Sequence, residues 1–515
     1  MQEIEILHPR MLETEEQGSL SRQDVFTALS TYKPRVIDLS KLSEADGLYL
    51  SAQGISEQLL IEAAEDSRVR ETQLLASFNP NYCPVSRTAT PFEKEIFEKA
   101  LLRDASYVLT VFECGGMLVR DPWSGDVVRS SHSFLIDDYH TAFRFCSKEV
   151  FYLMVGQTFG RRIAFIVPRL RLVAIFPLNP INAALLAWIT ECADHLVATL
   201  ISKGASIRRV LTCPTIGGGI QVGFRPNLGH YVWQELQGIA DVIEAVGVKR
   251  IFHLVLGPYA PFDPRDVFPE LSSVLTTVVK NPVEPFDATF HLNVQHVRPV
   301  GLRISSTLRR RIQELSESRL SKERKDAIQA RASSKFLVWV NLRSHNKAWK
   351  RQVDGTAEVL NRLSERIPNL AVVFDGFSDT ADICAAIGGL LDPEIDVVNT
   401  LGCPLEESLG WARAIHVYIS VVGSGLVINS WLSKKPGVAH ANRAHLRQAT
   451  FWGLVAEDIV APIFLSPTIV EDDGTMYGTY DFDPDVLYEL VLSLVQSYYP
   501  HSLCEAGQPA ANPSA

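Results

Sequence analysis

Short hydrophobic runs alternate with amphipathic segments over the last third of the chain. The hydrophobic runs cover residues 336–340, 370–374, 395–398 and 417–420, and helical patterns cover residues 353–366, 379–390, 405–414 and 427–432. Strands that alternate with helices form βαβ units, and such units build a parallel sheet. The pattern therefore predicts a Rossmann-like domain over residues 336–500.

The same alternation begins earlier and predicts a first Rossmann-like domain over residues 205–302. In it we expect a strand over 209–213, a loop at 217–219, an amphipathic helix over 231–246 and a strand over 250–256. Residues 303–335 are rich in Arg, Lys, Glu and Ser, which is typical of a solvated helix. We expect this segment to be a helical connector between the two domains.

Residues 1–204 are expected to form an accessory region of mixed α and β structure. Runs of β-forming residues at 107–112, 134–136 and 162–167 indicate antiparallel or mixed strands within it. The tail, residues 501–515, has the composition of a disordered segment. The predicted fold is an α/β protein with two Rossmann-like domains facing a cleft and an N-terminal β-rich accessory region.

Composition and charge exclude several classes of protein. The chain has 515 residues and a formal net charge of −10, which argues against a nucleic-acid partner because phosphate backbones attract basic surfaces. The apolar segment 181–201 contains Glu191 and Asp194, so we expect a core helix and no transmembrane segment. The eight cysteines lack metal-binding or C-x-x-C spacing, and the acidic N-terminus lacks an apolar signal region. We therefore expect a cytoplasmic protein without a metal site; homo-oligomer formation is left open.

Two loops that follow predicted strands are suited to hold negative charge. Arg343, Lys347 and Lys350 follow the strand at 336–340, and Gly423-Ser424-Gly425 follows the strand at 417–420. Cations attract an anion, and glycines let backbone N–H groups approach it. Two such loops in one α/β unit predict a nucleotide diphosphate site and a group transferase.

Each loop also has a plainer interpretation. The basic loop could be a solvent-facing turn, although Trp349 within it requires a packing partner. The glycine loop could be a tight turn needed for packing alone. Because both loops occur in the expected order within one domain, we favour the anion site.

With these residues, the C-terminal half resembles the donor-binding domain of a GT-B glycosyltransferase. The segment from Arg343 to Lys350, with its Trp349, is similar to the K-x-W-type diphosphate segment of heptosyltransferases. Residues 422–429 resemble the H-G-A-G-L-x-N loop of the family typified by plant xylosyltransferases and extracellular O-linked GlcNAc transferases. They keep the glycines and the Leu but lack the leading His, and Asn429 at the end of the segment is a further pocket candidate.

The same family carries an Asn-x-x-His-Trp-like element in its N-terminal domain. Residues 227–233, which contain Asn227 and His230, are similar to it. The resemblance implies two domains of the GT-B type, a nucleotide-sugar donor and a glycan or protein as the acceptor. It covers scattered motifs between about residue 208 and residue 500.

Glycosyl transfer requires a stabilised leaving diphosphate and a base for the acceptor hydroxyl. No D-x-D appears on the pattern that binds a metal–diphosphate pair in the other glycosyltransferase fold, so we expect a metal-independent reaction without a cofactor, in which Arg343, Lys347 and Lys350 neutralise the diphosphate. His230 is the candidate base, because the start of a helix favours a neutral imidazole; capping or packing of the helix is the alternative. Glu235 would either orient His230 or face solvent.

Further pocket candidates come from the remaining glycine and polar positions. Gly218 and Gly219 lie in a glycine triplet without G-x-G-x-x-G order, so a plain turn is equally open. Asn442, Arg443 and His445 follow the hydrophobic run at 436–439. The predicted function is an inverting, metal-independent glycosyltransferase. Its rivals are a non-catalytic nucleotide- or sugar-binding protein and an NAD-dependent α/β oxidoreductase or epimerase.

Overall fold

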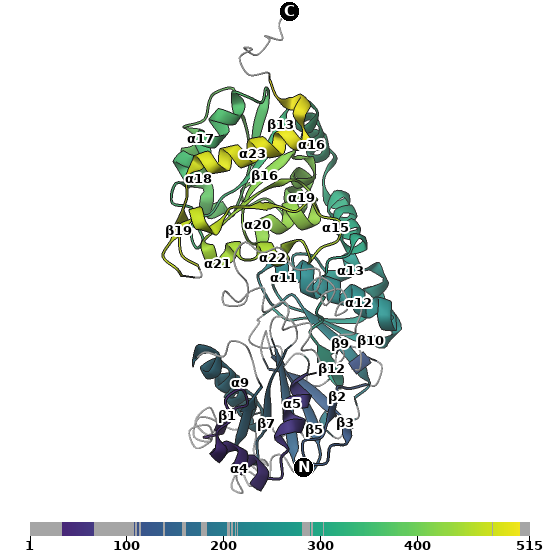
Figure 1. Ribbon diagram of the computed structural model, residues 1–515. Helices are drawn as coiled ribbons and strands as arrows, with labels where there is room; N and C mark the ends of the chain where they lie inside the picture. The colour runs from purple at the N-terminus through teal and green to yellow at the C-terminus, as the bar shows by residue number, and fades with distance from the viewer. Residues whose placement is uncertain are drawn as a thin grey trace, which may run out of the picture. The chain divides into compact units, whose positions relative to one another are not determined.

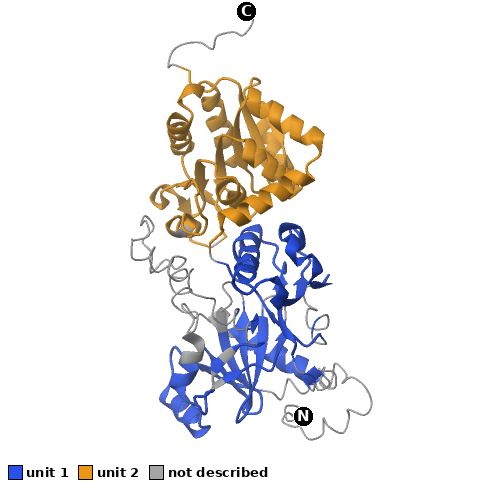
Figure 2. Cartoon of the chain, turned by 90° about the vertical axis from the view of Figure 1, so that its right-hand side faces the viewer, with its two compact units in different colours: residues 1–75, 95–302 blue, residues 76–94, 303–515 orange. Residues whose placement is uncertain are grey.

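The computed structural model describes residues 33–65, 115–136, 140–156, 161–176, 183–202, 215–280, 292–301, 303–475 and 477–504, together with single positions at 108, 111, 112, 207, 210, 211, 213 and 289 (Figure 1). The described residues fall into two compact units, one up to residue 301 and one from residue 303 on (Figure 2). Among the described helices, none has both the length and the apolar composition needed to cross a membrane.

The first unit contains a mixed sheet near its N-terminal end. The order of strands across this sheet is β1-β8-β7-β6-β5-β4, in which β1 and β8 are parallel and the other neighbours are antiparallel. The strands are β1 (Arg35–Asp38), β4 (His132–Leu135), β5 (His140–Cys146), β6 (Val150–Gly156), β7 (Arg161–Val167) and β8 (Leu172–Ile175). The predicted β-rich region is confirmed for the runs at 134–136 and 162–167. The run at 107–112 is largely outside the described residues, and its described positions, 108, 111 and 112, are helical, so a strand is wrong there.

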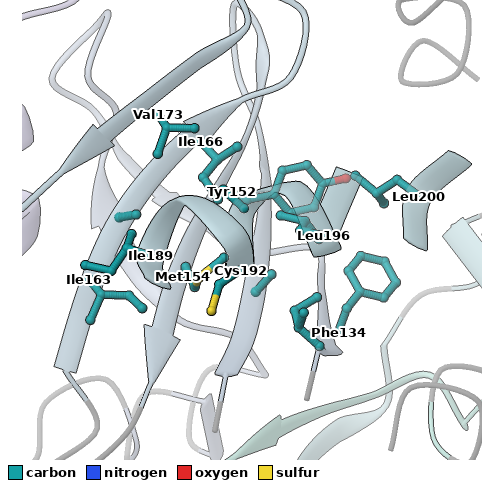
Figure 3. Packing of buried hydrophobic residues seen from close by; sticks show 14 of the residues in the cluster. Phe134, Tyr152, Met154, Ile163, Ile166, Val173, Ile189, Cys192, Leu196 and Leu200 are labelled. Atoms are coloured by element: carbon teal, nitrogen blue, oxygen red, sulfur yellow. The ribbon is translucent and has the colours of Figure 1, made fainter. Parts of the chain in front are cut away.

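A long helix covers one face of this mixed sheet. Helix α9 (Ala183–Ser202) contributes Ile189, Cys192 and Leu196 to a hydrophobic core that it shares with Tyr152 and Met154 of β6 (Figure 3). The apolar segment at 181–201 is therefore a core helix where it is described, as its interrupting acidic residues indicate. Smaller elements complete this region: α4 (Glu44–Ala52), α5 (Glu57–Glu65), and the antiparallel pair β2 (Leu118–Arg120) and β3 (Val127–Arg129).

The second sheet of the first unit is fully parallel. Its strands are β9 (Gly217–Val222), β10 (Ile251–Leu256), β11 (Leu275–Val278) and β12 (Val294–Val297), in the spatial order β11-β10-β9-β12. The predicted helix is a continuous run of α11 (Leu228–His230), a π-helical segment (Tyr231–Leu236) and α12 (Gln237–Val246). Short helical segments follow at Val248–Arg250, Pro264–Val267 (α13) and Pro269–Ser273.

Two sequence predictions in this sheet are wrong. Val210 and Leu211, inside the predicted strand 209–213, are helical, and the predicted loop at 217–219 is the start of β9. Packing explains the glycines, because a Cβ on Gly217 or Gly218 would come within 2.4 Å of the ring of Phe252 or Phe112. Glycine is therefore kept in this strand by close approach of side chains.

The second unit contains a six-stranded parallel sheet in the order β15-β14-β13-β16-β17-β18. Numbered along the chain, this is the order 3-2-1-4-5-6 of a dinucleotide-binding α/β fold. The strands are β13 (Phe336–Asn341), β14 (Leu370–Asp375), β15 (Asp396–Asn399), β16 (Val417–Val421), β17 (Gly437–His440) and β18 (Ile463–Phe464). The four strands predicted over 336–420 are confirmed.

The helices predicted in the second unit are confirmed as well, with small shifts of their ends. They are α17 (Gln352–Ser364), α18 (Ala381–Gly388), α19 (Leu405–Ala414), and α20 (Ser424–Leu426) followed by a π-helical segment (Val427–Leu432). Later in the chain come the helices α21 (Arg443–Leu446), α22 (Ala449–Trp452) and α23 (Pro484–Tyr498), and the antiparallel pair β19 (Glu471–Asp472) and β20 (Tyr480–Asp481). Short 3-10 segments lie at Ser378–Thr380, Pro467–Ile469 and Pro500–Ser502.

The segment predicted as a charged connector forms α15 (Ser306–Arg319) and α16 (Lys322–Ser334). Its helical character is confirmed, but α15 is not simply solvated. Leu308 and Ile312 are buried, and the guanidinium of Arg309 donates to the carbonyl oxygens of Trp431 (2.7 Å) and Glu457. The chain is thus an α/β protein with two Rossmann-like parallel sheets and a β-rich N-terminal region.

Candidate functional site

The two predicted anion-binding loops lie side by side at the carboxyl edge of the second unit's sheet. Strands β13 and β16 are neighbours, with Val340 paired to Ile419, and the strand order reverses between them. In open α/β sheets, ligands bind outside the carboxyl ends of the strands at such a reversal. The loop after β13 carries Arg343 and Lys347, and the loop after β16 carries Gly423.

Arg343 and Lys347, which we call the cation pair, point at Gly423. A Cβ on Gly423 would lie 3.1 Å from Lys347 Nζ and 3.2 Å from Arg343 Nη2. The ammonium group also donates to the carbonyl oxygen of Val422 at 3.1 Å. Gly423 has φ +149°, a conformation that other residues rarely adopt. Because Gly423 has no side chain, no Cβ from this loop lies against the two cationic groups.

Lys347 is buried and Arg343 is partly buried, and the charge of the nearby Asp375 carboxylate favours the charged form of Arg343. Lys347 is only 8% exposed, and its pKa falls to about 8 because burial, and then Arg343, disfavour the ammonium form. Burial likewise lowers the pKa of Arg343. Within the described part of the chain, neither side chain forms an ion pair with a carboxylate. Buried charges are normally paired, so this arrangement is one that an anion would complete.

The loop that carries the cation pair is held by packing and by hydrogen bonds. Trp349 is buried and stacks on Phe482, with ring centroids 4.3 Å apart, and its Nε1 donates to Asp481 at 3.0 Å. Gln352 accepts from the backbone N–H of Arg343 at 2.9 Å and donates to its carbonyl oxygen at 2.8 Å.

Lys347 itself has φ +59°, and its N–H donates to the carbonyl oxygen of Tyr477 at 3.0 Å. A solvent-facing turn is therefore the wrong interpretation for Arg343 and Lys347. It does describe Lys350, which is exposed.

The glycine loop is fitted against the end of β13. A Cβ on Gly425 would lie 2.7 Å from three atoms of the Asn341 side-chain amide. That amide donates to Asp375 Oδ2 at 3.0 Å, and burial raises the pKa of Asp375 to about 6. Gly425 is therefore required for packing, while Gly423 and Ser424 remain partly exposed at the edge of the site.

The other candidates in the second unit have structural contacts. Asn429 is buried and donates to Ser420 Oγ at 3.2 Å. The guanidinium of Arg443 donates through Nε to the carbonyl oxygen of Val470 at 2.7 Å. Asn442 caps α21, where its Oδ1 accepts from His445 N at 3.1 Å, and it donates to the carbonyl oxygen of Thr475 at 3.1 Å.

His445 lies next to the cation pair. It is 7% exposed, and its pKa falls to about 4, first because of burial and then because of the charges on Lys347 and Arg343. Its Nδ1 is 2.8 Å from Asn442 Oδ1. The structure thus brings a neutral imidazole to the same edge of the sheet as the two cations.

In the first unit, Asn227 and His230 lie at the start of the predicted helix. Asn227 Oδ1 accepts from His230 N at 3.1 Å and caps α11. His230 Nδ1 is 3.0 Å from Gln234 Oε1. The pKa of His230 falls to about 4 because of burial and the nearby charges of Arg225 and Arg298. The histidine is therefore neutral at pH 7, as expected at the start of a helix, but it is a weaker base than an ordinary imidazole.

Neither role considered for Glu235 matches the structure. The side chain is buried, with 1% of the residue exposed, and its carboxylate accepts from Gly223 N at 2.7 Å and pairs with Arg298. The residue that contacts His230 is Gln234, whose Oε1 lies 3.0 Å from the imidazole Nδ1. Glu235 instead joins the ends of β9 and β12.

Gly218 and Gly219 are buried within β9. A Cβ on Gly219 would come within 2.7 Å of His296, whose Nε2 is 2.8 Å from Nδ1 of His253. The two glycines therefore make room for side chains inside the first unit. Among the described residues, no group of three His, Cys, Asp or Glu side chains is placed to hold a metal ion.

Sequence reasoning placed the strand-end turn at Asp375 near the nucleotide but missed Asn341 and Gln352 as parts of the site. Asn341 and Asp375 are the polar residues that end the hydrophobic strands β13 and β14. A polar residue directly after such a run lies at the carboxyl edge, so the pattern held a usable signal. Gln352 follows the basic loop and offers no comparable signal.

Comparison with known proteins gave structural matches only. No family model and no curated protein sequence matches the chain. A family 9 glycosyl transferase from Veillonella parvula matches with 11% identity and a TM-score of 0.35, over 55% of this chain and 97% of that one. The Escherichia coli ADP-heptose lipopolysaccharide heptosyltransferase II matches with 14% identity and a TM-score of 0.27, over 48% of this chain and 78% of that one. MnaA from S. aureus, solved with UDP, matches with 9% identity and a TM-score of 0.28, over 55% of this chain and 90% of that one. At these values the likeness does not identify an activity.

Proposed function

We propose that this chain is an inverting, metal-independent glycosyltransferase that moves a hexose or pentose from a nucleotide-sugar donor to a hydroxyl of a glycan or a protein. The observation that supports the proposal is the cation pair, Arg343 and Lys347, which lies beside Gly423 at the strand-order reversal of the second unit and forms no ion pair with a carboxylate among the described residues. The donor diphosphate is the anion that we assign to this place.

The chemistry of the leaving group fits the two side chains. When the glycosidic bond to the diphosphate breaks, negative charge grows on the departing oxygen, and fixed cations stabilise it. A guanidinium binds two oxygens with its planar fork, whereas an ammonium acts as a compact charge. Lys350 is exposed on the same loop and would add a weaker, solvent-screened attraction.

The basic loop also argues for a diphosphate of a nucleotide sugar over a dinucleotide. A dinucleotide fold places G-x-G-x-x-G after its first strand. Here the first strand of this sheet, β13, is followed by Leu342-Arg343-Ser344-His345, without glycine. The charge on the phosphates would therefore be met by side chains more than by backbone N–H groups.

For the acceptor, we propose His230 as the base. Its Nδ1 is 3.0 Å from Gln234 Oε1, and a proton held on Nδ1 by that oxygen would leave the lone pair on Nε2 for a hydroxyl proton. A pKa of about 4 makes a weak base, and an anionic group bound beside Arg225 or Arg298 would raise it. Glu235 supports this arrangement indirectly, by holding Gly223 and Arg298 at the strand ends.

The proposal is tested by calorimetric titration with ADP, UDP and GDP. The wild type should bind at least one of them, and Lys347→Ala should weaken that binding about 10- to 100-fold, the loss of one charge-assisted contact. Lys434→Ala is the matched control, because Lys434 also has positive φ (+56°, against +59° for Lys347) and is exposed.

Three outcomes would count against the proposal. Equal effects of the two substitutions would remove the cation pair from the binding site. Binding without release of nucleoside diphosphate from any sugar conjugate would indicate a non-catalytic binding protein. A thermal shift with NAD(P) but with no nucleoside diphosphate would indicate the oxidoreductase or epimerase class.

A further inference from the structure

Asn442 fixes the protonation pattern of the His445 ring. Asn442 Nδ2 donates to the carbonyl oxygen of Thr475 at 3.1 Å, which sets the direction of the amide. Its Oδ1 therefore faces His445 and is 3.1 Å from that residue's backbone N and 2.8 Å from Nδ1. An amide oxygen can only accept, so Nδ1 carries the ring proton.

The other ring nitrogen is consequently a hydrogen-bond acceptor. His445 is neutral at pH 7, because burial and the cation pair keep its pKa near 4, so Nε2 holds a lone pair. Within the described part of the chain, Nε2 of His445 has no hydrogen-bond partner, and Lys347 Nζ donates instead to Val422. An acceptor thus stands beside two cations in a site otherwise suited to an anion.

The diphosphate bridge of a nucleotide sugar cannot satisfy this acceptor. It is esterified at both ends and fully ionised at neutral pH, so its oxygens only accept hydrogen bonds and repel a lone pair that faces them. The group that complements Nε2 is a hydroxyl, and a nucleotide sugar carries hydroxyls on either side of its diphosphate. We propose that Nε2 of His445 accepts a hydrogen bond from a hydroxyl of the donor, on the ribose or on the transferred sugar, next to the diphosphate held by Arg343 and Lys347. This inference rests on the proposed function and makes His445 a specificity-determining residue.

Two substitutions distinguish the contributions of the two ring nitrogens of His445 to binding. His445→Asn keeps an N–H at the δ position for Asn442 and removes the acceptor at the ε position. His445→Gln extends the amide to the ε position, where its oxygen can accept. Calorimetric titrations would use inorganic pyrophosphate, then ADP, UDP and GDP, then ADP-glucose, UDP-glucose and GDP-mannose. Thermal unfolding verifies that both variants are folded.

The expected result is selective. Pyrophosphate binding should be unchanged in both variants, whereas His445→Asn should weaken hydroxyl-bearing ligands about tenfold, the value of one hydrogen bond, and His445→Gln should restore most of the loss. If the loss already occurs with the nucleoside diphosphate, the hydroxyl is on the ribose. If it occurs only with the sugar conjugate, the hydroxyl is on the sugar.

A measurement on the wild type makes the test independent of the variants' folding. Ligands that lack single ribose or sugar hydroxyls should bind about tenfold more weakly when the missing group is the one that His445 binds. Equal losses for pyrophosphate and nucleotide sugar in His445→Asn, or full affinity for every deoxy ligand, would overturn the inference. Failure of the wild type to bind any nucleoside diphosphate would instead overturn the proposed function.

Discussion

Replacement of Gly425 by Ala tests how the glycine loop is fitted to the sheet. The added Cβ would lie 2.7 Å from Cγ, Nδ2 and Oδ1 of Asn341, much closer than a van der Waals contact. Asn341 is buried, and its Nδ2 donates to Asp375 at 3.0 Å. The methyl group therefore cannot be accommodated unless the amide or the start of α20 moves.

The cost follows from these contacts. Overpacking of a dense interior costs about 1–3 kcal/mol, and displacement of the Asn341 amide removes a hydrogen bond worth about 1 kcal/mol. We expect Gly425→Ala to destabilise the second unit by about 2–4 kcal/mol. A shift of α20 would also displace Gly423, so nucleoside diphosphate binding should weaken in the same variant.

The assay is urea-induced unfolding followed by tryptophan fluorescence, with Gly388→Ala as the control. Gly388 is the last residue of α18, and a Cβ there meets nothing within 4 Å. Its replacement should be neutral or stabilising by up to about 1 kcal/mol, because Ala is the better helix former. Similar midpoints for the two variants would refute the steric argument at Gly425.

Three further predictions concern charge and pH. Because the pKa of Lys347 is about 8, nucleoside diphosphate binding measured by calorimetry should weaken about tenfold per pH unit above pH 8; a flat profile up to pH 10 would contradict this. Replacement of Glu235 by Gln leaves the buried Arg298 without its charge partner and should cost about 3–5 kcal/mol in urea unfolding, and an unchanged midpoint would be inconsistent with the pair. His296 and His440 both have a pKa of about 3 in the folded protein, below about 6.5 in the unfolded chain. The unfolded state therefore binds protons first as the pH falls below 6.5, and each histidine should remove about 2 kcal/mol of stability between pH 6.5 and pH 5. Equal unfolding midpoints at both pH values would refute this.

The second unit could be predicted from sequence because its strands are buried on both faces. Such strands appear as continuous hydrophobic runs, as β13 and β14 do. Strands β13 and β16 are neighbours, so the loops that follow them lie next to each other. This is why Arg343 and Gly423, which the sequence assigned to one anion site, are adjacent in the structure. Trp349 also has the packing partner that its sequence context required, namely Phe482.

The errors have a common physical cause, which is contact between residues distant in sequence. Gly217 and Gly218 have the local sequence pattern of a loop. They lie in a strand because the rings of Phe252 and Phe112 occupy the space that a Cβ would need there. Glu235 pairs with Arg298, which local helix periodicity cannot reveal. The sequence predicted that Gly425 helps to bind an anion, but in the structure it packs against the side chain of Asn341.

Release of nucleoside diphosphate from a panel of sugar nucleotides, followed by chromatography, tests the central claim most directly. We expect the wild type to cleave at least one donor, slowly even with water as the acceptor. Lys347→Ala should reduce this rate about 10²- to 10³-fold, as expected for loss of one fixed electrostatic stabiliser, while Lys434→Ala should leave it unchanged. Equal rates for Lys347→Ala and the wild type, or no release from any donor, would contradict the assignment of the cation pair to a departing diphosphate.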